Sequence, residues 1–213
     1  MSALVITVDG PAASGKGTIA ATLGRHYGLP VLDTGLLYRA VGVLLQRAGG
    51  DPDDMQSAGA QAKALSVAML EDPAFRTRAA GEAASRVAVH ATVRAALLQL
   101  QRDFAATPGG AVLDGRDMGT VIAPDAPAKL YVTASPEVRA GRRHRQLVAQ
   151  GEDVSFEDVL ADIRLRDARD AARQASPMRP AEDAVLLDTS EMTIDQAADA
   201  ARRIVEAARA RRP

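Results

Sequence analysis

The sequence predicts an α/β fold in which helices cover both faces of a five-stranded parallel sheet. Short apolar runs alternate with longer helical patterns along the chain, as expected for parallel strands joined by crossover helices. A glycine-rich segment separates the first apolar run from the first helical pattern, and polar residues follow each expected strand, at the edge where such sheets bind ligands. The expected strands are Leu4–Val8, Val31–Leu32, Ala111–Leu113, Lys129–Val132 and Val185–Leu187.

Length and composition narrow the class of protein. The 213 residues suit a single domain, residues 1–213, with a substantial core. A formal net charge of −1 argues against a nucleic-acid partner, and the absence of cysteine excludes disulfides and thiol catalysis. No apolar run reaches the roughly 20 residues that cross a bilayer, and no signal-peptide pattern is present. We expect a cytoplasmic monomer without a membrane partner.

The segment after the first strand has the features of a phosphate-binding loop of the Walker type. Gly10 and Gly15 allow the backbone to wrap round an anion, the following helix directs its positive end at it, and Lys16 adds a cation. Gly17 replaces the usual hydroxyl residue, and Thr18 follows one position later. The expected phosphate-binding residues are Gly10, Pro11, Ala12, Ala13, Ser14, Gly15, Lys16, Gly17 and Thr18.

The second strand leads into a helical region. Thr34 is expected to cap the next helix, in which Arg39 lies about one and a half turns from the start. A turn and a weak helix follow, and then a long helix from Gly81 to Phe104. We expect residues 34–100 to form a mobile subdomain that covers a substrate.

The third strand ends in the cluster Asp114-Gly115-Arg116-Asp117-Met118-Gly119-Thr120. The acidic residue that ends a neighbouring strand in Walker-type sites takes part in holding Mg²⁺. We therefore expect Asp114 to hold Mg²⁺ through water, and no protein side chain to ligate the metal directly.

Two later helices carry arginines at helical spacing. Ser135-Pro136 marks the start of the first helix, which carries Arg139 and Arg143 on one face. Ser155 is expected to cap the second helix. Because a short turn joins them, the two helices are suited to fold over a polyphosphate. We expect residues 144–174 to form this lid. The last strand precedes an edge helix from Ile194 to Ala210. The arginine-bearing face of the second helix consists of Arg166, Arg169, Asp170 and Arg173.

These motifs, which span almost the whole chain in order, resemble those of bacterial cytidylate kinases, members of the nucleoside monophosphate kinase family. The resemblance rests on the phosphate loop, Leu32-Asp33-Thr34-Gly35 with Tyr38-Arg39, the Asp114–Thr120 cluster, residues 124–127, Arg166–Asp170 and residues 180–184. It implies Mg²⁺-dependent phosphoryl transfer from ATP to CMP or dCMP. It also implies a three-layer P-loop NTPase fold with a nucleoside monophosphate-binding subdomain (34–100) and a short helical lid (144–174).

The resemblance also assigns roles to residues. It implies that Thr34, Arg39 and Arg116 bind the CMP phosphate, that Ser85, Arg94 and Asp117 read cytosine, and that Arg166 and Asp170 lie at the ribose. Arg173 would reach toward the acceptor phosphate. A carboxylate at position 117 suits cytosine, because it accepts from the exocyclic amine and repels the carbonyl of uracil. The implied catalytic residues are Lys16, Arg116, Arg139, Arg143 and Arg169.

One region departs from the family pattern, and two alternatives remain open. Residues 66–78 show no run of alternating strands, so we expect a shortened insertion in the subdomain. The first alternative is a kinase of UMP, AMP, dTMP or shikimate on the same scaffold. The second is a nucleotide switch without catalytic activity, although the chain contains no asparagine for the Asn-Lys-x-Asp motif of guanine switches.

Overall fold

The computed structural model describes residues 3–172 and 176–211, and it confirms the parallel sheet. The strand order is β2-β3-β1-β4-β5, and every neighbouring pair is parallel. Each strand contains the expected apolar run and extends beyond it by at least one residue. The strands are β1 (Leu4–Asp9), β2 (Val31–Asp33), β3 (Gly110–Gly115), β4 (Ala128–Thr133) and β5 (Val185–Asp188).

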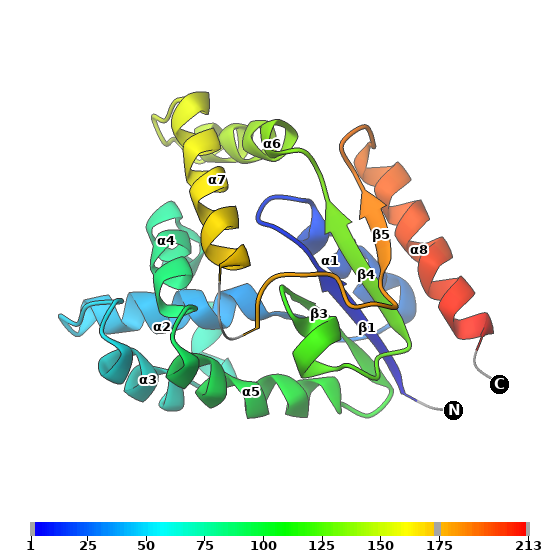
Figure 1. Cartoon of the computed structure of the whole chain (residues 1–213), viewed down its shortest axis with the longest axis horizontal. Coiled ribbons are helices and arrows are strands. Elements are labelled where there is room, and N and C mark those ends of the chain that lie inside the picture. The colour runs from blue at the N-terminus through cyan, green and yellow to red at the C-terminus, as the bar shows by residue number, and fades with distance from the viewer. Residues whose placement is uncertain (1–2, 173–175, 212–213) are drawn as a thin grey trace.

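Helices cover both faces of the sheet, so the fold has three layers. On one face, α1 (Lys16–Tyr27) and α8 (Ile194–Ala210) pack on side chains such as Ile6 and Val8. On the other, α2 (Thr34–Arg47) and α5 (Ala91–Ala105) pack on Leu32 and Leu113. The bounds of α8 agree with the prediction. Figure 1 shows α6 and α7 above the carboxyl ends of the strands. Among the described residues, no helix has the length and apolar character needed to cross a membrane.

The subdomain between β2 and β3 is entirely helical in the part of the chain that is described. Besides α2 and α5 it contains α3 (Met55–Lys63), α4 (Arg78–Val87) and two short 3₁₀ helices, η1 (Val67–Glu71) and η2 (Pro73–Arg76). The two 3₁₀ helices occupy the segment where a shortened insertion was expected, and no strand forms there.

The prediction of one long helix from Gly81 to Phe104 is wrong. The chain leaves helical geometry between α4 and α5, and His90 is extended, with φ −77° and ψ 121°. The ring Nε2 of His90 lies 2.9 Å from the carbonyl oxygen of Pro52, which belongs to a distant turn. Neither glycine nor proline marks the break, so local sequence contains no signal for it.

The predicted cap by Thr34 is also wrong. Asp33 occupies the N-cap position of α2, and α2 begins at Thr34 itself. The Thr34 hydroxyl instead donates to the backbone oxygen of Asp114 at 2.8 Å, across to the end of β3. This side chain therefore joins two strand ends at the ligand-binding edge of the sheet.

The two arginine-bearing helices form a hairpin with its own small core. They are α6 (Pro136–Ala149) and α7 (Phe156–Ala171), and their apolar contact consists mainly of Ala140, Leu147, Val159 and Ile163. The predicted caps are confirmed, because Ser135 Oγ accepts from the Val138 amide at 3.3 Å and Ser155 Oγ accepts from the Asp158 amide at 3.0 Å.

Candidate active site

The loop between β1 and α1 has the backbone geometry of an anion cradle. Gly10, Ala13 and Gly15 all have positive φ values, and a Cβ atom built on Gly10 would lie 1.9 Å from the Val132 oxygen. Gly10 is therefore required by close approach to β4 as well as by backbone conformation. Gly15 is the N-cap of α1, and no side chain caps this helix. The first amides of α1 therefore remain available to an anion at its positive end.

Two cavities meet at this loop. One, of about 420 Å³, lies between α2, α4, α6 and α7, and the other, of about 530 Å³, lies between the loop, α6 and the start of α8. A ligand in one cavity would therefore meet a ligand in the other at a point lined by two cations, Lys16 and Arg143. The residues that line both cavities are Ala13, Lys16, Gly17, Arg143 and Gln146.

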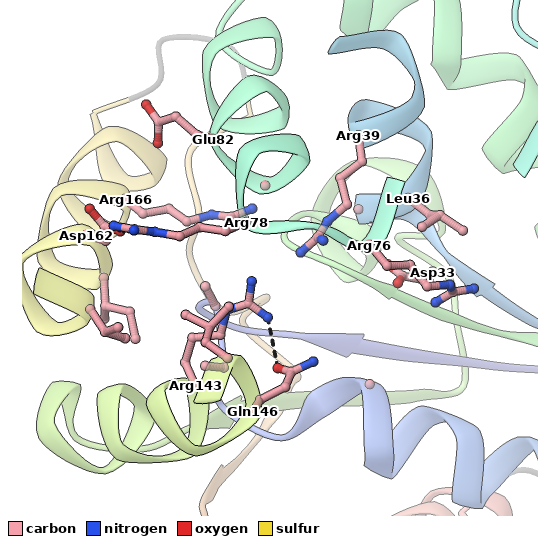
Figure 2. Close-up of a pocket in the computed structure, with 18 of the residues that line it drawn as sticks. Asp33, Leu36, Arg39, Arg76, Arg78, Glu82, Arg143, Gln146, Asp162 and Arg166 are labelled. Carbon is pink, nitrogen blue, oxygen red and sulfur yellow. Dashed lines mark hydrogen bonds and ion pairs between the residues drawn. The ribbon is translucent and has the colours of Figure 1, made fainter. Parts of the chain in front are cut away.

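The first cavity contains cations that have no acidic partner. Arg39 of α2 donates to the carbonyl oxygen of Phe75 at 3.3 Å, and Arg143 of α6 donates to Gln146 at 2.9 Å. Among the described residues, neither guanidinium has a carboxylate within ion-pair distance. Burial lowers the pKa of both groups, and the nearby Arg143 and Arg116 lower that of Arg39 further. Figure 2 shows Arg39 and Arg143 entering the same space from opposite sides, so the cavity is suited to a multiply charged anion.

Ion pairs close the outer side of this cavity. Arg78 of α4 donates through Nε to Asp162 of α7 at 3.0 Å, and Arg169 of α7 donates to Glu82 of α4 at 2.6 Å. Arg78 and the neighbouring Arg76 also line the cavity, although neither was predicted to be a site residue. The two arginines flank Thr77, at the end of the segment expected to be a shortened insertion. Two cations so close together in the sequence were the available indication of an anion site.

Lys16 and Asp114 face each other beneath the phosphate loop. Lys16 Nζ lies 3.4 Å from Asp114 Oδ1, which is buried and accepts no hydrogen bond among the described residues. Burial raises the pKa of Asp114, and the charge on Lys16 opposes this. Burial and the nearby Arg116 lower the pKa of Lys16. No group of three or more metal-ligating side chains occurs in the described part of the chain.

A smaller pocket of about 40 Å³ lies deeper in the subdomain and contains the expected base-reading residues Arg94 and Asp117. Their side chains form a buried ion pair, and the Arg94 guanidinium lies 5.7 Å from the ring centroid of Tyr38. Burial opposes the charge on Arg94, but Tyr38 and Asp117 outweigh it and raise its pKa. Ser85 of α4 is 2% exposed, and its hydroxyl has no hydrogen-bond partner among the described residues.

Arg116 and Asp170 form an ion pair at the 40 Å³ pocket, on the side where it adjoins the 420 Å³ cavity. Arg116 Nε donates to Asp170 Oδ2 at 3.0 Å, and Asp170 is 1% exposed. Burial disfavours the charged guanidinium, but the adjacent Asp170 carboxylate outweighs this and raises the pKa of Arg116. Arg116 and Arg166 line both the 420 Å³ cavity and the 40 Å³ pocket, so they connect the first cavity with the Arg94–Asp117 pair.

Arg139 and Arg169, which were expected to be catalytic, do not line the first cavity. Arg139 is 3% exposed and pairs with Asp167 at 2.6 Å while donating to the Ala12 and Ala134 carbonyl oxygens. These contacts hold α6, α7 and the phosphate loop together. Arg169 pairs with Glu82, as described above, and Arg173 lies outside the described residues.

Comparisons with known proteins show the family of this chain. The family model described as "Cytidylate kinase" matches residues 6–207. A cytidylate kinase from Caulobacter sp. (strain K31) is 68% identical over 209 residues, which cover 98% of this chain and 97% of that protein. One from Caulobacter vibrioides (strain NA1000 / CB15N) is 69% identical over 207 residues, with 97% of each chain covered. An uncharacterized protein from Eubacterium ventriosum ATCC 27560 has a similar fold, with a TM-score of 0.58 at 14% identity over 97% of this chain and 99% of that one.

Proposed function

The chain belongs to the cytidylate kinase family and transfers a phosphoryl group from ATP to CMP or dCMP, and we propose that its two adjoining cavities hold these substrates. The observation that carries this assignment is that Lys16 and Arg143 line both cavities at the phosphate loop. The family match favours CMP over the other acceptors considered, and a catalyst over a switch. The proposal includes a cytoplasmic location, where soluble nucleotides are available, and a monomeric protein.

The acceptor nucleotide is assigned to the 420 Å³ cavity and the small pocket beyond it. Arg39, Arg116 and Arg143 would neutralise its phosphate, and Arg39 and Arg143 are favourably placed because no acidic side chain occupies them. Thr34 lies beside Arg116 in the small pocket. Guanidinium groups suit this task because their planar donors match phosphate oxygens. Arg166 and Asp170 are assigned to the ribose, and Arg173 to the acceptor phosphate from the end of the lid.

The Arg94–Asp117 pair is assigned to the cytosine base. Together the pair presents N–H donors and a carboxylate acceptor, which complement the ring acceptors and the exocyclic amine of cytosine. Ser85, also assigned to the base, does not line this pocket, although its neighbour in the chain Ala84 does. A pyrimidine ring needs more room than the present pocket offers, so binding requires α4 and α5 to separate from Asp117.

The donor nucleotide is assigned to the cavity on the other side of the loop. The uncapped start of α1, with residues Gly10–Thr18, would bind its phosphates, and Lys16 would hold the phosphoryl group as it moves. Such transfers have loose transition states, so alignment and charge neutralisation supply most of the catalysis. Arg116 and Arg143 contribute to that neutralisation from the acceptor side, and no dedicated general base is required.

The residues present fit Mg²⁺. Asp114 Oδ1, which faces Lys16 but accepts no hydrogen bond among the described residues, is a hard ligand of the kind that Mg²⁺ prefers. Mg²⁺ in kinases is held mainly by phosphate, water and one or two carboxylates. Asp114 would hold the ion through water. When bound, the ion neutralises charge on the phosphate oxygens.

We propose that two parts of the protein move during the reaction, the subdomain at residues 34–100 and the lid at residues 144–174. The separate core of α6 and α7 supports movement of the hairpin as a unit. Its closure would exclude water, which otherwise accepts the phosphoryl group. For Arg139 and Arg169 to contact phosphate, their pairs with Asp167 and Glu82 must break as the lid rearranges.

Turnover with several acceptors tests these assignments. The wild-type protein with ATP and Mg²⁺ is expected to convert CMP and dCMP faster than UMP or AMP. Asp117→Asn should reduce the preference for CMP over UMP by about tenfold or more, because the variant loses a charged acceptor for the cytosine amine. Equal losses with CMP and UMP would contradict the assignment of Asp117 to the base.

A further inference from the structure

Asp9 is a buried acid to which the assignments above give no role. It ends β1 directly before the phosphate loop and is 4% exposed. Its Oδ1 accepts a hydrogen bond from the backbone amide of Met118 and its Oδ2 accepts one from that of Gly119, both at 2.8 Å. The two amides lie 109 and 110 residues further along the chain and begin the short helical turn η3 (Met118–Ile122).

The residue that would ordinarily cap this turn is engaged elsewhere. Asp117 occupies the N-cap position of η3, where an aspartate normally accepts from the amides of the first turn. It makes no such bond, and its carboxylate pairs with Arg94 in the small pocket instead. The amides at the start of η3 are thus satisfied by a carboxylate from another strand.

We propose that Asp9 is a positioning residue, which caps η3 from β1 and thereby leaves the Asp117 carboxylate free to read the acceptor base. This inference rests on the proposed role of Asp117. Without the Asp9 carboxylate, the buried amides of Met118 and Gly119 would lack an acceptor, and buried amides strongly favour finding one. Asp117 is the adjacent carboxylate in the chain, so it would turn toward its own helix and away from the base.

Close packing supports this role. Asp9 pairs in register with Gly115, two residues before Asp117, so one end of the β1–β3 ladder leads into both loops. A Cβ atom on Gly119 would lie 3.0 Å from Thr7 Oγ1 and 3.4 Å from Asp9 Oδ2. The start of η3 is therefore packed closely against β1, and a side chain at position 119 would displace its neighbours by a few tenths of an ångström.

The test compares four proteins, the wild type, D9N, D117N and the double variant, by kcat and KM for CMP, UMP and ATP. Asparagine keeps one acceptor oxygen and replaces the other with a donor, so one of the two amides loses its partner. Burial, together with the charges of Asp117 and Asp114, raises the pKa of Asp9 to about 7, so the assays belong at about pH 8.5, where its carboxylate predominates. Thr7→Val is the matched control, since the buried Thr7 hydroxyl near Gly119 has no hydrogen-bond partner among the described residues.

We expect D9N to lower the CMP-to-UMP ratio of kcat/KM by about tenfold, with the KM for ATP within about twofold of wild type. In the D117N background, D9N should change that ratio no further, because the two residues act on one contact. Thr7→Val should leave the ratio and both KM values unchanged. If D9N is recovered unfolded, D9E provides the second test, since it keeps the carboxylate but displaces η3, and it should show the same loss of preference.

Three results would overturn the inference. The first is an equal loss of kcat/KM for CMP and UMP in D9N. The second is a rise in the KM for ATP as large as the rise in the KM for CMP. Either result would mean that Asp9 supports only the phosphate loop. The third is an equal effect of D9N with and without Asp117. An unaltered CMP preference in D117N itself would refute the proposed base reader. An altered preference in D117N together with an unaltered one in D9N would refute only the role of Asp9.

Discussion

Replacing Asp9 with asparagine should change how the stability of the protein depends on pH. In the folded protein, burial is the main cause that raises the pKa of Asp9 from 3.8 to about 7, with the Asp117 and Asp114 carboxylates adding to it. Between these values the folded protein binds a proton that the unfolded chain does not bind. The free energy of unfolding therefore falls as the pH rises, by about 1.4 kcal/mol per pH unit.

Between about pH 5 and about pH 8, this linkage removes about 3 kcal/mol from the stability of the wild-type protein, most of it below pH 7. Asp9→Asn cannot ionise, so its contribution to the slope vanishes. Whatever the variant loses through its missing acceptor is the same at every pH. The free energy of unfolding of the wild type, minus that of the variant, should thus decrease by about 3 kcal/mol over this range.

Urea unfolding followed by circular dichroism, at four pH values from about 5 to about 8, measures this difference. Glu191→Gln, which removes an exposed carboxylate that has no hydrogen-bond partner among the described residues, is the control substitution. Parallel curves for the wild type and Asp9→Asn would show that Asp9 does not titrate in this range, and would refute the reasoning from its burial.

Two further substitutions test the phosphate loop. Lys16→Ala should lower kcat by about a hundredfold or more, while calorimetry shows CMP still bound, because Lys16 serves the transferring group; a large loss of CMP affinity would instead place Lys16 in the acceptor site. Gly10→Ala should lower the free energy of unfolding by about 3 kcal/mol or more, because its Cβ would lie 1.9 Å from the Val132 oxygen. Gly28→Ala is its control, since Gly28 has positive φ but no atom within 4 Å of a built Cβ, so a loss of about 1 kcal/mol is expected. Similar thermal midpoints for the two alanine variants would argue against steric exclusion at Gly10.

Several parts of the site could be predicted from the sequence because their signals are local. Gly10, Gly15 and Lys16 lie in one loop between an apolar strand and a helix, and the structure has the expected strand, loop and helix there. The caps by Ser135 and Ser155 were predictable for the same reason, since each joins residues three apart. Arg143 was singled out by its helical spacing from Arg139, and Arg39 by its place in the helix that follows the second strand; both line one cavity.

Other parts depended on contacts between distant segments. At the break between α4 and α5, His90 contacts the carbonyl oxygen of the distant Pro52. The Thr34 hydroxyl donates to the backbone oxygen of Asp114 and does not cap its own helix. Arg139 and Arg143 share a helix face by spacing, yet Arg139 is buried against Asp167 while Arg143 enters the cavity. Helical periodicity places a side chain on a face, but the neighbouring element determines whether it meets a carboxylate or open space.

The sequence by itself therefore determined the five strands, the phosphate loop and the family, because each of these depends on residues that are neighbours in the chain. Only the tertiary structure decided which carboxylate satisfies which amide at the active site. Asp9 and Met118 are 109 residues apart, and no local pattern records that they meet, since their contact exists only once β1 and β3 lie side by side in the sheet.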